Sequence, residues 1–141
     1  GLTNSIRYKS WDFSITARAS IGNYAYNNLA SNAVFNAAAS VNNILNNIHS
    51  DYLSTGFIDF TENSLLSDHY IQEASFVKID NISIGYNLST KNGCKVRVFG
   101  SLQNVATFTD YQGIDPEIYG GIDNNFYPRP QTGVFGVTFE F

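Results

Sequence analysis

The sequence contains no methionine, one cysteine and three prolines, and only 14% of its 141 residues are charged. A typical soluble domain has about one quarter charged residues, so this chain has few side chains for a solvated surface. A single cysteine, Cys94, cannot form an internal disulfide and says little about redox compartment. No apolar run reaches the roughly 18 residues of a transmembrane helix, which excludes that way of crossing a membrane. The net charge of -4 leaves no basic patch, so we expect no nucleic-acid partner.

Aromatic residues are abundant, at 15% of the chain, with 9 tyrosines and 11 phenylalanines. Few charges, many aromatic residues and a mean hydropathy of -0.15 do not suit a disordered chain. They suit a β-rich protein, and they fit an outer-membrane barrel because apolar residues alternate with polar ones there. The sequence begins at Gly1 without an initiating methionine or a signal peptide, so we expect a mature product or a fragment.

The last nine residues carry a period-two alternation that predicts a β-strand with one apolar face. Phe135, Val137, Phe139 and Phe141 are large and apolar, whereas the residues between them are small or polar. An apolar phase that ends on an aromatic residue suits a closed sheet whose outer surface meets lipid, where aromatic residues form girdles.

Three further strands and a partial one, residues 1–8, are predicted upstream. Apolar residues alternate from Trp11 to Ile21, and the strand is predicted to continue through Tyr24 and Tyr26. Residues 74–88 form the next strand, and its change of phase predicts a β-bulge near Asp80. Residues 94–108 alternate again, after the hairpin signal Asn92-Gly93.

Two long excursions, residues 27–70 and 110–125, separate these strands, whereas residues 9–10 and 89–93 are short turns. The first excursion contains apolar residues at helical spacing between Val34 and Tyr52, which predicts a loop helix capped by Ser31 or Asn32. Short turns that alternate with long loops are typical of a bacterial transmembrane barrel, with the turns in the periplasm.

Candidate chemistry is confined to the loops. His49 and His69 have no cysteine or carboxylate at metal-ligand spacing, and Cys94 begins a strand on its apolar face, so all three are expected to be ordinary structural residues. Hard oxygen ligands gather in the second loop and form a candidate calcium site, although their spacing is not that of an EF-hand. That site consists of Asp110, Asp115, Glu117 and Asp123.

Aromatic residues of the second loop are candidates for stacking on sugar rings, or for an interfacial girdle, which we favour. These residues are Tyr111, Tyr119, Phe126 and Tyr127. No catalytic constellation or cofactor motif is visible, so the sequence does not predict an enzyme.

Several stretches resemble the SusC/RagA-type TonB-dependent outer-membrane transporters. They are SDHYIQEASFVKIDNISIGYNL (67–88), SLQNVATFTDYQGIDPE (101–117), GIDNNFYPRPQTGVFGVTFEF (121–141) and YKSWDFSITARASIGNYAYN (8–27). Their order along the chain also fits that family. The resemblance implies an all-β fold of antiparallel strands that form the last part of a large transmembrane barrel. Residues 1–141 would then be its C-terminal segment, without the N-terminal plug.

The resemblance also implies a function in the cell outer membrane. The whole protein would import oligosaccharides or peptides, driven by TonB-ExbB-ExbD and covered by a SusD-like lipoprotein. Barrel-assembly machinery would recognise the alternation from Phe135 to Phe141. Two alternatives remain open from the residues alone: a soluble exported β-domain with a structural or adhesive role, and a small carbohydrate-processing enzyme with a carboxylate pair.

Overall fold

The structure is a computed structural model that describes residues 1–31, 67–89, 94–124 and 127–140. The chain divides into two compact units. The first, here called the strand unit, comprises Gly1–Ile21, Phe76–Thr109 and Arg129–Phe141. The second, the loop unit, comprises Gly22–Ser75 and Asp110–Pro128. The loop unit is therefore made of the two excursions that interrupt the strands in sequence.

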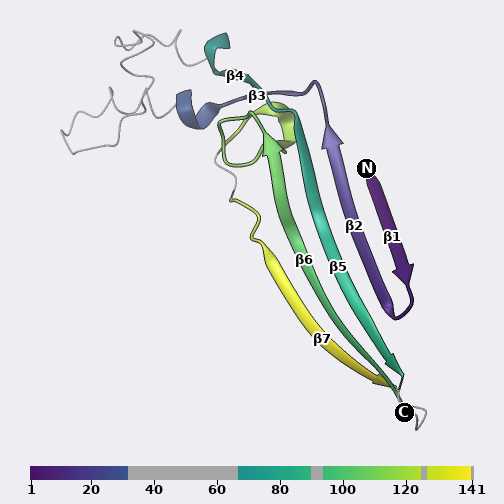
Figure 1. The fold of residues 1–141 in the computed structure, drawn as a ribbon. Coiled ribbons are helices and arrows are strands. Elements are labelled where there is room, and N and C mark those ends of the chain that lie inside the picture. The colour runs from purple at the N-terminus through teal and green to yellow at the C-terminus, as the bar shows by residue number, and fades with distance from the viewer. Residues whose placement is uncertain (32–66, 90–93, 125–126, 141) are drawn as a thin grey trace, which may run out of the picture. The chain divides into compact units, whose positions relative to one another are not determined.

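The strand unit is one antiparallel sheet, in which five strands lie side by side in the order β1-β2-β5-β6-β7 (Figure 1). The strands are β1 (Leu2–Tyr8), β2 (Trp11–Ser20), β5 (Phe76–Ser89), β6 (Lys95–Thr109) and β7 (Thr132–Glu140). Neighbours in the sheet are also successive along this part of the chain, as in a β-meander. The prediction of an all-β, antiparallel fold is confirmed.

Strand β2 ends at Ser20, earlier than the pattern of apolar residues predicts. Gly22 has a φ of +81°, a left-handed conformation that interrupts an extended strand and that glycine adopts without strain. Tyr24–Tyr26 then forms a separate short strand, β3, which pairs with β4 (Ile71–Glu73) in the loop unit. The prediction of one continuous strand through Tyr26 is therefore wrong.

The predicted β-bulge at Asp80 is confirmed. Against β2, Thr16 pairs with Asn81 and Ala17 pairs with Ile79, so Asp80 is the extra residue. Against β6, the register shifts at the same level, where Asn104 has a φ of +53°. The bulge keeps the apolar residues on both sides of it on one face of the sheet.

The loop unit contains β3, β4 and two short 3-10 turns, Asp68–Tyr70 (η2) and Tyr119–Gly121 (η3). Its core packs Ala25, Ala74 and Tyr111 together, with Ile118 against them. A parallel bridge between Tyr26 and Ile122 ties the second excursion to the first.

The first excursion becomes helical at residues 28–31, where Asn27 Oδ1 accepts a hydrogen bond of 2.9 Å from the Ala30 amide. Asn27 therefore caps this short helical segment, which contains Ser31. Asn32 and the predicted helix from Val34 to Tyr52 lie outside the described residues, so that helix and its cap stay a prediction. No helix within the described part of the chain is long and apolar enough to cross a membrane.

Candidate luminal face and loop site

Register and period two separate the side chains of the sheet into two faces. Apolar pairs follow one another on the first face, for example Phe13 with Ile84 and Val98 with Val137. The second face, here called the polar face, carries mostly polar and charged side chains. Its members include Arg7, Asp12, Ser14, Thr16, Arg18, Asn81, Ser83, Asn87, Arg97, Ser101, Gln103 and Thr138.

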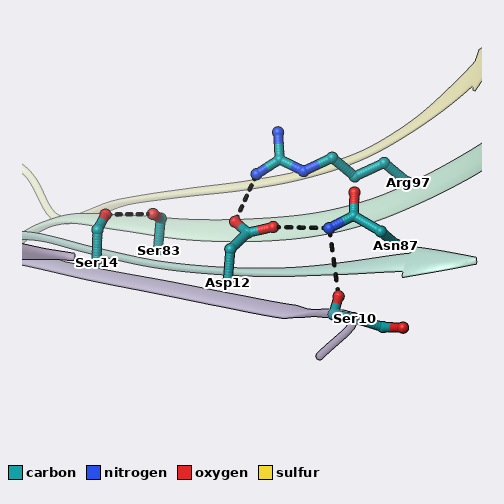
Figure 2. A network of polar contacts seen from close by, with 6 residues as sticks. All are labelled: Ser10, Asp12, Ser14, Ser83, Asn87 and Arg97. Carbon is teal, nitrogen blue, oxygen red and sulfur yellow. Dashed lines mark hydrogen bonds and ion pairs between the residues drawn. The ribbon is translucent and has the colours of Figure 1, made fainter. Parts of the chain in front are cut away.

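An ion pair on the polar face joins two strands that are not neighbours. Arg97 Nη2 of β6 donates to Asp12 Oδ2 of β2 at 2.6 Å, although β5 lies between them (Figure 2). The pair crosses β5 at Gly85, the partner of Asp12 in the ladder. A methyl group on Gly85 would lie 2.6 Å from Asp12 Oδ2 and 2.9 Å from Arg97 Nη2, so any larger residue there would displace the two side chains of this bridge.

Hydrogen bonds extend the ion pair to the turn between β1 and β2. The Asn87 amide donates to Asp12 Oδ1 at 3.1 Å and to the Ser10 carbonyl at 3.2 Å (Figure 2). Farther from that turn along β2 and β5, the hydroxyls of the ladder partners Ser14 and Ser83 lie 2.7 Å apart. Polar atoms at this end of the polar face are therefore paired across β2, β5 and β6.

The same arginine, Arg97, also contacts an aromatic ring on the side toward β7. The Arg97 guanidinium lies 5.6 Å from the centre of the Phe99 ring, within the range of a cation–π contact. The Phe99 ring covers Gly136 of β7, where a side chain would collide with it. Asp12, Arg97 and Phe99 thus form one continuous connection over β2, β5, β6 and β7.

A further charged cluster lies at the bulge, nearer the other end of the strands. Arg18 Nε donates to both carboxylate oxygens of Asp80, at 2.8 Å and 3.0 Å. Lys78 and Arg18 both lie over the ring of Phe76, at 5.2 Å and 6.0 Å from its centre. Because Lys78 is only 2% exposed, this cation lies among protein atoms and not in open solvent.

The loop unit contains a buried tyrosine–carboxylate pair. The Tyr111 hydroxyl donates to Asp123 Oδ2 at 2.8 Å, and the two residues are 5% and 3% exposed. Burial, with smaller contributions from the hydrogen bond and the charge of Asp123, raises the pKa of the Tyr111 phenol well above its usual 10.0. Gly113 faces this ring so closely that a side chain there would collide with it. The pair holds the second excursion together, and the Asp123 amide also donates to the Tyr26 carbonyl at 2.9 Å.

The four aromatic residues proposed for ligand stacking occupy different environments. Tyr119 and Tyr127 are 96% and 92% exposed, so their rings are accessible. Tyr111 has its ring in the loop core and is not accessible in the same way. Phe126 lies outside the described residues. Ligand binding by these aromatic residues stays a prediction, for which Tyr119 and Tyr127 are the accessible candidates.

Two of the four acidic residues of the candidate calcium site accept hydrogen bonds from different protein groups. Asp123 accepts from Tyr111, and Asp115 Oδ1 accepts from the Glu117 amide at 2.9 Å. Within the described residues no three histidine, cysteine, aspartate or glutamate side chains gather in a way that could hold a metal ion. His49 lies outside the described residues, and His69 stacks edge-on against Tyr70.

The chain is similar to known proteins both in sequence and in fold. No family model matches the chain. The TonB-dependent receptor SusC of Bacteroides thetaiotaomicron is 36% identical over all of this chain, and the TonB-dependent receptor P3 of Formosa agariphila is 32% identical over the same extent. The chain spans only 15% and 16% of the lengths of these two curated relatives.

Solved structures similar in fold include the RagAB peptide transporter, with a TM-score of 0.67 and 22% identity over 96% of this chain. The RagAB peptide importer in its "open-open" state gives a TM-score of 0.69. The match covers 99% of this chain but only 16% of the importer chain. These proteins are transporters and not enzymes. The sequence identity to TonB-dependent receptors and the partial-barrel fold shared with RagAB lead to the same family, and the chain belongs to the SusC/RagA-type TonB-dependent receptors.

Proposed function

We propose that residues 1–141 are the C-terminal part of a transmembrane barrel that imports nutrients across the outer membrane. The observation that carries this proposal is the separation of faces in a sheet whose two edges are open. Within the described residues β1 and β7 each pair with one neighbour only. A bilayer does not tolerate unpaired strand edges, so further strands of a longer polypeptide complete the sheet.

The apolar face meets lipid in this proposal, and the polar face lines the lumen. Leu102, Phe108 and Phe135 are more than half exposed, so no second protein layer covers this face in the described part of the chain. This exposure disfavours the alternative of a soluble β-domain, which requires the apolar side chains to face a core. The paired ions and hydroxyls of the polar face suit a wet interior.

Topology supports an orientation for the barrel. The β1–β2 turn and the β5–β6 connection lie at one end of the sheet, since Trp11 pairs with Tyr86 and Leu88 pairs with Val96. Both excursions leave from the opposite end, after Ser20 and Thr109. Because barrels of this class have short periplasmic turns and longer outer loops, we assign the loop unit to the extracellular side.

The cargo we propose is an oligosaccharide or a peptide, taken up with a SusD-like lipoprotein and energised by TonB-ExbB-ExbD. Support comes from the names of the relatives: receptors called TonB-dependent, and a fold neighbour called a peptide transporter. Tyr119 and Tyr127 offer accessible rings in the loop unit on which a sugar ring or a peptide side chain can stack.

The last strand also carries our proposed signal for barrel assembly. Phe135, Val137 and Phe139 lie on one face of β7, all exposed, and Phe141 lies outside the described residues. Replacing Phe139 and Phe141 with serine is expected to lower the yield of inserted receptor. A polar-face control, Thr138→Ser, is expected to leave that yield unchanged, and equal losses in both variants would contradict the proposal.

Uptake by the full-length receptor tests the transport proposal. Cells that depend on the receptor are given a labelled oligosaccharide series and a labelled peptide series, with and without TonB. We expect TonB-dependent uptake of one series, reduced by the pair Tyr119→Ala and Tyr127→Ala. Tyr24→Ala, an exposed tyrosine of the loop unit outside the second excursion, serves as control. Uptake of neither series, or uptake independent of TonB, would overturn the proposal.

A further inference from the structure

The apolar face of the sheet is not uniformly covered by side chains. Two adjoining hollows of about 350 Å³ and 370 Å³ lie on it, and Ile84, Gly100 and Phe135 line both. The first continues along Leu102 and Gly133, and the second continues past Trp11. Together they form one groove across β5, β6 and β7, here called the Gly100 groove.

Glycines create this groove. Gly100 lies between Ile84 of β5 and Phe135 of β7 in the ladder, where an apolar side chain would otherwise be expected. A methyl group added to Gly100 would approach only the Val134 carbonyl, at 3.9 Å, so the space above it is open. Gly133 likewise faces Leu102, whose nearest methyl would be 3.4 Å from an added carbon. The groove floor is therefore backbone, and its walls are large side chains.

Aromatic rings line one end of the groove, and a cation lies beyond them in the β1–β2 turn. Trp11 and Tyr86 pack with their ring centres 4.5 Å apart, and Tyr8 is the ladder partner of Trp11. Lys9 follows in the turn, with its ammonium 5.4 Å from the centre of the Tyr8 ring. Tyrosine and tryptophan favour the level of lipid head groups, and a lysine beside them can contact a phosphate.

We propose that the Gly100 groove binds a glycerophospholipid of the periplasmic leaflet, with one acyl chain over Gly100 and the head-group phosphate beside Lys9. The leaflet follows from the position of the groove near the β1–β2 turn, which the proposed function assigns to the periplasm. The class of ligand follows from the lining: an apolar trench with one cation at its end matches an acyl chain joined to a phosphate. This lipid site rests on the membrane location given under the proposed function. The specific binding of one lipid goes beyond that proposed function.

Lipid retention by the full-length receptor tests the site. Native mass spectrometry follows the binding of palmitoyl-oleoyl-phosphatidylglycerol to detergent-purified receptor. We expect one tightly held lipid in the wild type. Gly100→Leu is expected to weaken its binding about tenfold, since a leucine displaces one or two methylene groups of the chain. Lys9→Asn, which suits the left-handed φ of +53° at this turn, is expected to weaken it about fivefold.

Ala19→Leu is the matched control, because Ala19 lies exposed on the same face but toward the other end of β2. It is expected to bind lipid as the wild type does. If Gly100→Leu does not insert, Gly133→Val blocks the groove from β7 and must weaken binding as well. Wild-type retention by the groove variants, or an equal loss in Ala19→Leu, would overturn the site. A receptor that keeps the lipid but imports nothing would refute the transport proposal alone.

Discussion

The strand unit and the loop unit are stabilised in different ways. Among the described residues, every buried hydrophobic side chain except Phe76 belongs to the loop unit, where Ala25, Ala74 and Tyr111 pack together. The strand unit has long ladders but exposed apolar side chains along one face. The loop unit is thus organised like a small soluble core, whereas in the proposed membrane setting the sheet depends on lipid and on further strands. The difference predicts that substitutions follow different rules in the two units.

The largest expected effect comes from an arginine on the apolar face near mid-strand. Leu102 lies at the centre of β6 and is 53% exposed, and Ser101 beside it points to the polar face. Leu102→Arg is expected to destabilise the inserted receptor by about 2–4 kcal/mol, the cost of a cation near the bilayer midplane. Ser101→Arg is expected to cost far less, because a charge there reaches the wet lumen. Equilibrium unfolding from lipid vesicles measures both, and equal costs would contradict the assignment of faces.

In the loop unit the largest effect is expected at the buried pair. Tyr111→Phe removes a hydroxyl donor from the nearly buried Asp123 carboxylate, at an expected cost of about 1–3 kcal/mol. The double variant with Asp123→Asn is expected to cost less than the sum of the two single variants, because the residues are in direct contact. Protease resistance of the extracellular loops in the full-length receptor measures each step. Strict additivity would mean that the two side chains do not stabilise one another.

Alkaline pH acts on the same pair. The pKa of the folded Tyr111 phenol is raised above its usual 10.0, mainly by burial, so the folded loop unit favours the neutral phenol. The stability due to this pair is fully present below the unfolded pKa and is lost as pH rises through the folded one. An absorbance titration of tyrosinate, wild type minus Tyr111→Phe, is expected to show this tyrosine ionising after the exposed ones. If the difference titration showed Tyr111 ionising at the pKa usual for tyrosine, the burial of its side chain would be contradicted.

The sequence predicted the elements of the sheet more fully than the contacts between them. Period-two alternation identified four strands, and the change of phase at Asp80 located the bulge, because both signals are local. The network of Asp12 and Arg97 was missed, since it joins residues far apart in sequence through a register that no local pattern specifies. The one available signal was Gly85, a small residue in a strand, which often marks a close approach.

The loop unit was predicted least well, for a related reason. Its core is assembled from two excursions, joined by the packing of Tyr111 on Ala25 and Ala74 and by the bridge between Tyr26 and Ile122. Neither excursion has a periodic pattern of its own there. The second loop was considered as a ligand and calcium site because its aromatic and acidic residues are close in sequence. Two of these residues, Tyr111 and Asp123, bond to each other, as buried polar groups generally do, and the ligand and calcium site stays a prediction.

The smallest expected effect lies on the polar face of the sheet, at the crossing over β5. Gly85→Ala places a methyl group where the Asp12 carboxylate meets Arg97, so both side chains must shift and the ion pair is expected to weaken. Because Asp12 and Arg97 are 23% and 47% exposed, the pair is screened, and its loss is expected to cost about 0–1 kcal/mol. Thr132→Ala is the control, a small change on the polar face of β7 outside this network. A loss for Gly85→Ala as large as that for Leu102→Arg would mean that the polar face is a dry core and not a lumen wall.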